Sequence, residues 1–153
     1  MKLRAAIFGM ALLAGFNVLK AQGSAAAAKG VGPRMFVEPS STTVYLGKVK
    51  LTVDPLCHKG QFYLGAYEIK VVPYSFKNEK GQLRMEISDE SYQKLTEGIA
   101  VEFTGKAIND KNGTEKVVLG KTMPATGDHG VATFSIVTDH GLMVFNTAYR
   151  LGD

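Results

Sequence analysis

The chain has 153 residues, of which 18 are Lys or Arg, 14 are Asp or Glu and one is Cys. A single cysteine excludes a disulfide within the chain, so packing must supply the stability of the fold. The formal net charge is +4, but three of the basic residues, Lys2, Arg4 and Lys20, lie near the N-terminus. Without them the net charge is +1, and this low value removes the whole-chain argument for a polyanion-binding protein.

Residues 1–23 have the pattern of a cleavable secretory signal. Lys2 and Arg4 precede an apolar run over residues 5–16, and small residues follow it. The run is shorter than the roughly 20 apolar residues that a membrane span needs. We therefore predict export to the periplasm, the outer surface or the medium, with no stable membrane insertion of the mature chain.

The remaining chain is predicted to hold one folded domain behind a leader. Residues 24–41 are rich in Ala, Gly, Pro and Ser, a composition typical of a flexible segment. Residues 42–153 are long enough to bury one continuous core.

From residue 44 onward the hydrophobic pattern mostly has the period of two that is typical of β-strands. Strands are predicted over residues 48–53, 62–74, 83–87, 99–109, 117–123, 131–138 and 142–150. Turns are predicted at residues 78–81, 110–113 and 139–141, where Asn, Asp and Gly gather.

The mature chain has one clear helix signal, over residues 88–98. Ser88 is suited to cap the first turn, acidic residues follow it, and Gly98 is suited to end the helix. Tyr92 and Leu95 are three residues apart and are expected to face the core. Tyr92 is therefore interpreted as a packing residue.

The order of these elements predicts a mainly-β fold. Three strands, a helix and two strands follow the β-β-β-α-β-β order of an OB-fold, with a C-terminal hairpin as an extension. Internal glycines suit strongly curved strands, at Gly47, Gly65, Gly105 and Gly120. We predict an OB-like antiparallel barrel, with a seven-stranded β-sandwich as the alternative.

Three segments carry a resemblance to known proteins. Residues 101–121, VEFTGKAINDKNGTEKVVLGK, resemble the strand-turn-strand half of many OB-fold proteins, in which a glycine follows the apolar run of the first strand. Residues 65–95, GAYEIKVVPYSFKNEKGQLRMEISDESYQKL, and residues 143–151, MVFNTAYRL, resemble small exported proteins of verrucomicrobial-type bacteria. One such OB-like protein is linked with a type IV pilus gene cluster. The resemblance implies a secreted, OB-like accessory protein and carries no catalytic residues.

No residue pattern indicates catalysis or a cofactor. The sequence has no Gly-x-Ser-x-Gly, no catalytic cysteine signature and no glycine-rich phosphate loop. His129 and His140 each lie in an Asp-His-Gly triplet, and at roughly 3.3 Å per residue the strand between them separates the triplets by more than about 20 Å. His58 beside Cys57 lacks the spaced partners of a zinc site. We predict a non-enzymatic protein with no catalytic residues, cofactor or metal.

The best candidate for a binding surface lies between residues 48 and 84, where basic and aromatic residues alternate. The candidate ligand-binding residues are Lys48, Lys50, Tyr63, Tyr67, Lys70, Tyr74 and Arg84. On an OB binding face, cations follow a polymer backbone and aromatic rings stack on bases or sugars. For each aromatic residue, packing in the barrel core is the alternative interpretation.

Two functions are therefore expected. The first is an exported accessory or binding protein of the cell envelope or surface, with a type IV pilus among the candidate structures, that acts by contact with envelope or surface proteins. An open strand edge would also allow homo-oligomers. The alternative is an OB module for an oligosaccharide or single-stranded nucleic acid, and export favours a glycan over nucleic acid.

Overall fold

The computed structural model describes residues 33–45 and 47–153. These residues form ten β-strands, one α-helix and one short 3-10 helix. The strands are β1 (Arg34–Val37), β2 (Ser40–Val44), β3 (Gly47–Val53), β4 (Leu56–Lys59), β5 (Phe62–Val72), β6 (Glu79–Glu86), β7 (Glu102–Asn109), β8 (Glu115–Pro124), β9 (His129–Thr138) and β10 (Gly141–Gly152). The helices are η1 (Ser75–Lys77) and α1 (Asp89–Thr96). The predicted mainly-β class is confirmed.

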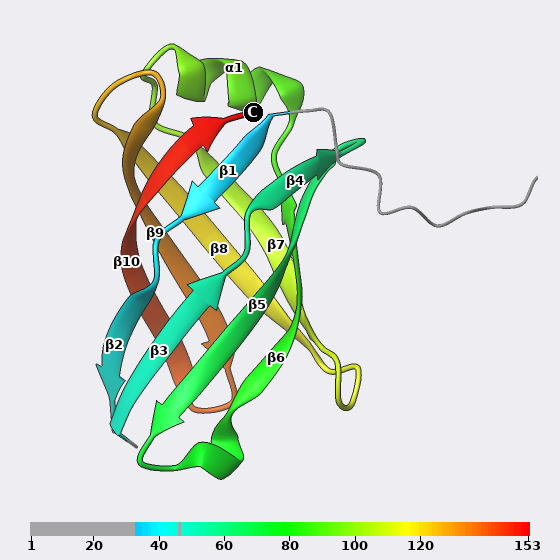
Figure 1. Ribbon diagram of the computed structural model, residues 1–153, viewed down its shortest axis with the longest axis vertical. Coiled ribbons are helices and arrows are strands. Elements are labelled where there is room, and N and C mark those ends of the chain that lie inside the picture. The colour runs from blue at the N-terminus through cyan, green and yellow to red at the C-terminus, as the bar shows by residue number, and fades with distance from the viewer. Residues whose placement is uncertain (1–32, 46) are drawn as a thin grey trace, which may run out of the picture.

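The strands form one antiparallel sheet that closes on itself as an eight-stranded barrel (Figure 1). Around the barrel the order is β5, β4, β1, β10, β9, β8, β7 and β6, and the ring closes where β6 pairs with β5. The two extra strands extend from β5, because β3 pairs with the second half of β5 and β2 pairs with β3. The predicted OB-like antiparallel barrel is confirmed, and its closure excludes the alternative β-sandwich.

Alternation along the strands decides which side chains fill the barrel. In β6, Leu83 and Met85 are buried, and the residues between and beside them are exposed. Phe103 and Phe134 pack edge to face in the interior, with ring centroids 5.9 Å apart. Gly120 lies against Phe103, where an added Cβ atom would be 1.9 Å from the ring. The phenyl ring therefore fills the space that a side chain at position 120 would need.

The helix α1 covers one end of the barrel (Figure 1). It begins as predicted, because the Ser88 Oγ accepts a hydrogen bond of 3.1 Å from a backbone N–H of the first turn. It ends before Gly98, whose φ of +78° suits a residue without a Cβ atom. Leu95 is 1% exposed, and the Tyr92 ring stacks on the ring of Tyr63 at 6.0 Å between centroids. The predicted packing role of both helix residues is therefore confirmed.

Two predicted boundaries are wrong. The leader predicted over residues 24–41 is too long, since β1 and β2 lie partly or wholly within it and Met35 is buried in the core. The turn predicted at residues 78–81 is mostly strand, because β6 begins at Glu79 and the chain reverses around η1. The short strand β4 was not predicted at all. The predicted signal, residues 1–23, and residues 24–32 of the leader lie outside the described residues.

Candidate functional site at the open end of the barrel

The two ends of the barrel differ. The helix α1 covers one end, and η1, the last residues of β2 and the β9–β10 turn lie at the other, here called the open end (Figure 1). A hollow of about 730 Å³ lies at the open end, within the range of small-molecule pockets. Its lining residues are Thr43, Val44, Tyr45, Ile69, Val71, Lys77, Glu79, Lys116, Thr138, His140, Gly141, Leu142 and Met143.

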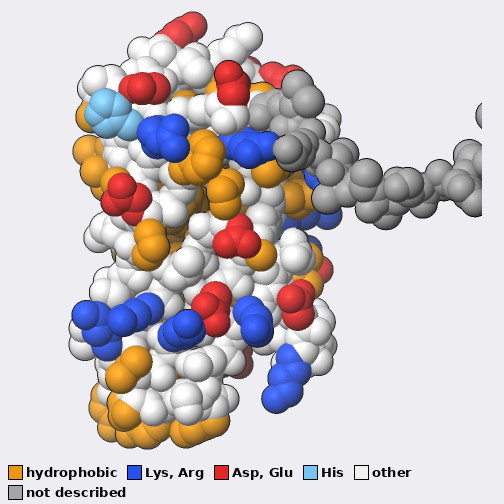
Figure 2. All heavy atoms as spheres, viewed as in Figure 1, with side chains coloured by type: hydrophobic (Ala, Val, Ile, Leu, Met, Phe, Trp, Pro, Cys, Tyr) orange, Lys and Arg blue, Asp and Glu red, His pale blue; other side chains and the backbone are white. Residues whose placement is uncertain are grey.

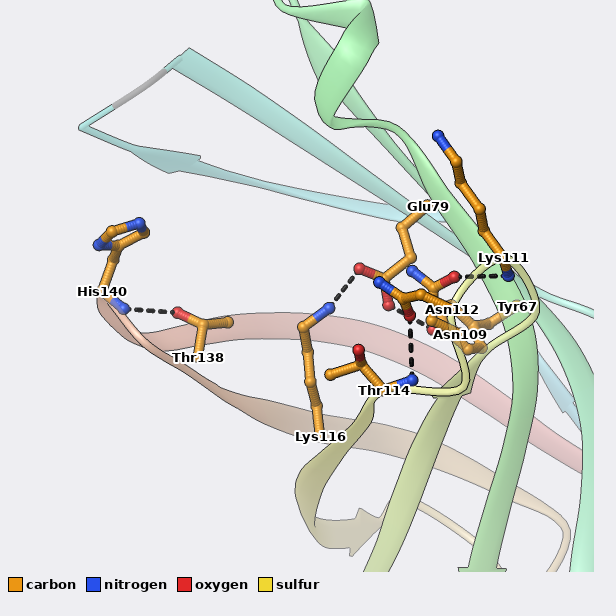
Figure 3. A network of polar contacts seen from close by, with 9 residues as sticks. All are labelled: Tyr67, Glu79, Asn109, Lys111, Asn112, Thr114, Lys116, Thr138 and His140. Atoms are coloured by element: carbon orange, nitrogen blue, oxygen red, sulfur yellow. Dashed lines mark hydrogen bonds and ion pairs between the residues drawn. The ribbon is translucent and has the colours of Figure 1, made fainter.

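A polar network borders this hollow (Figure 3). The Tyr67 hydroxyl donates a hydrogen bond of 2.5 Å to Glu79 Oε1, and the Lys116 ammonium group donates to Glu79 Oε2 and forms an ion pair with it. Both charged side chains are shielded, because Glu79 is 14% exposed and Lys116 is 22% exposed. A carboxylate removed from water to this extent requires donors and an opposite charge, and the network supplies both.

The network changes how Glu79 titrates. Burial by itself would raise the pKa of this carboxyl group, but the hydrogen bonds from Lys116 and Tyr67 outweigh burial and lower the pKa below its ordinary value. Burial raises the pKa of Tyr67, and its hydrogen bond to Glu79 raises it further. At neutral pH Glu79 is therefore an ionised carboxylate and Tyr67 a neutral phenol.

Large apolar side chains surround the open end and are here called the apolar rim: Tyr45, Tyr74, Phe76 and Leu142. Tyr45 is fully exposed, Phe76 is 77% exposed and Leu142 is 59% exposed. The rings of Tyr74 and Phe76 meet edge to face, with centroids 5.8 Å apart. Figure 2 shows hydrophobic side chains gathered at this end of the molecule. A gathering of exposed apolar residues marks an interaction site more often than the same residues scattered singly.

Lys48, Lys50 and Lys70 point outward from β3 and β5 and form what we call the basic wall. Lys50 and Lys70 lie directly opposite each other in the strand register. Lys70 also forms an ion pair of 3.2 Å with Glu68. Figure 2 shows Lys and Arg side chains as a band across this face, with acidic side chains among them. The structure thus brings together the three lysines of the predicted binding surface.

The aromatic residues of the predicted surface lie elsewhere. Tyr63 and Tyr67 are 1% and 3% exposed and face the barrel interior, so their rings cannot stack on a ligand outside the barrel. Their inclusion in an outer binding face was wrong, because both occupy the inward-facing positions of β5. Tyr74 belongs to the apolar rim, and Arg84 lies outward on β6 with its guanidinium carbon 3.5 Å from the centroid of the Phe62 ring.

The three histidines are dispersed. His129 and His140 lie at opposite ends of β9, as predicted, and His58 Nε2 is 3.5 Å from a carboxylate oxygen of Asp89. Cys57 is a half-buried free thiol. Within residues 33–45 and 47–153, no group of three or more His, Cys, Asp or Glu side chains is arranged to hold a metal ion.

Sequence reasoning missed Glu79 and Lys116. A signal was present, because Lys116 precedes Val118 and Gly120 in the inward-facing row of β8. A charged residue in the apolar row of a strand predicts an opposite charge or a polar opening nearby. The partner of Lys116 lies 37 residues away in the chain, however, so neither strand reveals the pairing by itself.

Comparisons of the chain with protein-family models, with curated proteins and with solved structures give no match. In the part of the chain that the structure describes, neither helix has the length and hydropathy of a membrane-spanning helix. The functional argument therefore depends on the geometry of the open end.

Proposed function

We propose that this chain is a non-enzymatic, exported binding protein of the cell envelope or surface that acts by protein contact through its apolar rim. The exposure of Tyr45, Phe76 and Leu142 at one end of the barrel carries the proposal. Burying such side chains against a partner removes apolar surface from water, which is the main favourable term in protein association. Aromatic residues are also enriched at the centres of protein interfaces.

The scaffold supports this function. Tyr74 and Phe76 lie at η1, which joins β5 to β6 of the closed barrel, and Leu142 lies at the start of β10. Tyr45 follows β2, one of the two extra strands. The basic wall lies on the neighbouring strands, and its lysines favour a partner with acidic residues beside its apolar contact. The resemblance to exported accessory proteins makes a surface structure, such as a type IV pilus, the first source of partners to test.

The test is affinity capture from an envelope extract with three forms of the protein. These are the unchanged protein, a rim variant with Tyr45→Ser and Phe76→Ser, and a control variant with Leu119→Ser and Met123→Ser. The control residues are 44% and 64% exposed and lie on the outer face of β8. The control therefore also replaces two exposed apolar side chains by serine, but away from the apolar rim. Circular dichroism must show that all three forms fold alike.

We expect the unchanged protein and the control to recover the same envelope protein, and the rim variant to lose it. With the recovered protein purified, the rim variant should bind at least about ten-fold more weakly, since truncating an aromatic hot spot of an interface costs about 2 kcal/mol or more. Equal recovery by all three forms would show that the rim is not the contact. Recovery of no specific protein would overturn protein contact as the function.

A further inference from the structure

We propose that the hollow at the open end binds one small amphiphile that carries a carboxylate head group. This ligand site goes beyond the protein-contact function proposed above. The hollow shares Tyr45 and Leu142 with the apolar rim, but the proposal does not depend on that function, because it rests on the half-buried apolar side chains and the lysines of the hollow.

The apolar part of the hollow suits a hydrocarbon chain. Ile69 is buried and belongs to the core, and Val44, Val71 and Met143 are half-buried side chains that pack against the core from the hollow. These residues come from three different strands, so they line the hollow from several sides. At about 730 Å³, the hollow has room for a small amphiphile.

The charged groups of the hollow select an anion. Lys77 and Lys116 line it, and among the described lining residues Glu79 supplies the one carboxylate. This carboxylate already accepts hydrogen bonds from Tyr67 and Lys116, so it is neutralised within the protein. The ion pair uses one donor of the Lys116 ammonium group, and Lys77 on η1 adds a second positive charge at the entrance. A carboxylate placed here would meet an excess of positive charge.

Titration calorimetry of the purified protein at neutral pH tests this site with decanoate, below the concentration at which it forms micelles. Decanol, with the same chain and no charge, is the comparison ligand. Lys77→Met removes a charge at the entrance of the hollow, and Lys50→Met removes the same charge from the basic wall. Both lysines are exposed, so neither change should disturb folding.

We expect one decanoate per chain and at least about ten-fold weaker binding of decanol, as the loss of one charge-assisted contact implies. Lys77→Met should weaken decanoate binding by about three-fold or more, and Lys50→Met should leave it unchanged. Three results would each overturn the proposal: no saturable binding of decanoate, equal affinity for decanol, or equal losses in the two lysine variants. None of them bears on protein capture by the apolar rim.

Discussion

The hydrogen bond between Tyr67 and Glu79 leads to the sharpest prediction about the open end. Tyr67→Phe removes only the hydroxyl group that lies 2.5 Å from Glu79 Oε1 and keeps the buried ring. Hydrogen bonds to charged groups contribute about 1.5–3 kcal/mol, and Glu79 is only 14% exposed, so water replaces the lost donor poorly. We expect the free energy of unfolding to fall by about 2 kcal/mol at pH 7, a clear part of the 5–15 kcal/mol that is typical of a domain.

The effect should depend on pH, and its sign follows from the lowered pKa of Glu79. A carboxyl group whose pKa is lower in the folded than in the unfolded protein contributes stability above its unfolded pKa, near 4.5, and this stability is lost as pH falls through the folded pKa. Below that pH the protonated Glu79 accepts an ordinary hydrogen bond, worth about 1 kcal/mol. The cost of Tyr67→Phe should therefore shrink by about half once the pH has fallen below the folded pKa of Glu79.

Urea denaturation followed by far-ultraviolet circular dichroism measures this cost, since the chain has no tryptophan to report by fluorescence. In a Glu79→Gln background, which removes the charge, Tyr67→Phe should cost about 1 kcal/mol at pH 7 and also at acidic pH. Tyr74→Phe makes the same chemical change at a 43% exposed ring and should stay within about 0.5 kcal/mol of the unchanged protein. An equal cost for Tyr67→Phe with and without the Glu79 charge at pH 7 would refute the charged hydrogen bond.

Three further predictions concern the fold. Leu95→Ala should lower the free energy of unfolding by about 2–5 kcal/mol, because Leu95 is 1% exposed on the inner face of α1, and a loss under about 1 kcal/mol would show that the helix does not seal the barrel. Ser88→Ala should cost about 1 kcal/mol through the lost cap, with Ser88→Gly costing less, and urea midpoints that show no loss would contradict the capping role. Gly120→Ala should destabilise the barrel by about 1–3 kcal/mol, because the added methyl group clashes with the Phe103 ring. In a Phe103→Leu background thermal unfolding should show a smaller cost, and an unchanged cost would show that Phe103 is not the source of the clash.

The elements that were predicted correctly are those whose signals are local. The cap at Ser88 and the stop at Gly98 lie within a few residues of the helix that they define. The turn around Gly113, with its φ of +70°, likewise uses neighbouring residues to reverse the chain between β7 and β8. Such signals act through backbone angles and short hydrogen bonds, so they can be read without knowledge of the fold.

The start of the domain was missed for the opposite reason. The strand β1 has four residues, and its stability comes from pairing with β10 at the other end of the chain. The backbone N–H of Glu38 donates to the Ala148 carbonyl at 3.0 Å, and the Thr147 hydroxyl donates to the Glu38 carbonyl at 2.5 Å. The sequence of residues 34–41 contains no signal for pairing with a strand more than a hundred residues away. Their composition was therefore interpreted as that of a flexible leader.

The candidate site residues also differ in how far the sequence could predict their positions. The sequence by itself determined that Lys48 and Lys50 share one face of a strand, because their spacing is the strand period. It did not determine that Tyr63 and Tyr67 face inward. Both faces of β5 carry apolar residues, so the alternation does not show which face points into the barrel.

Alternating strands, turns and the capped helix were determined by the sequence, because each depends on residues close together in the chain. Only the tertiary structure decided that β1 meets β10, that α1 covers one end of the barrel, and that Glu79 meets Lys116 beside the hollow at the other. These arrangements join segments far apart in the chain. Their stability comes from packing and charge pairing across the closed barrel, which no local pattern records.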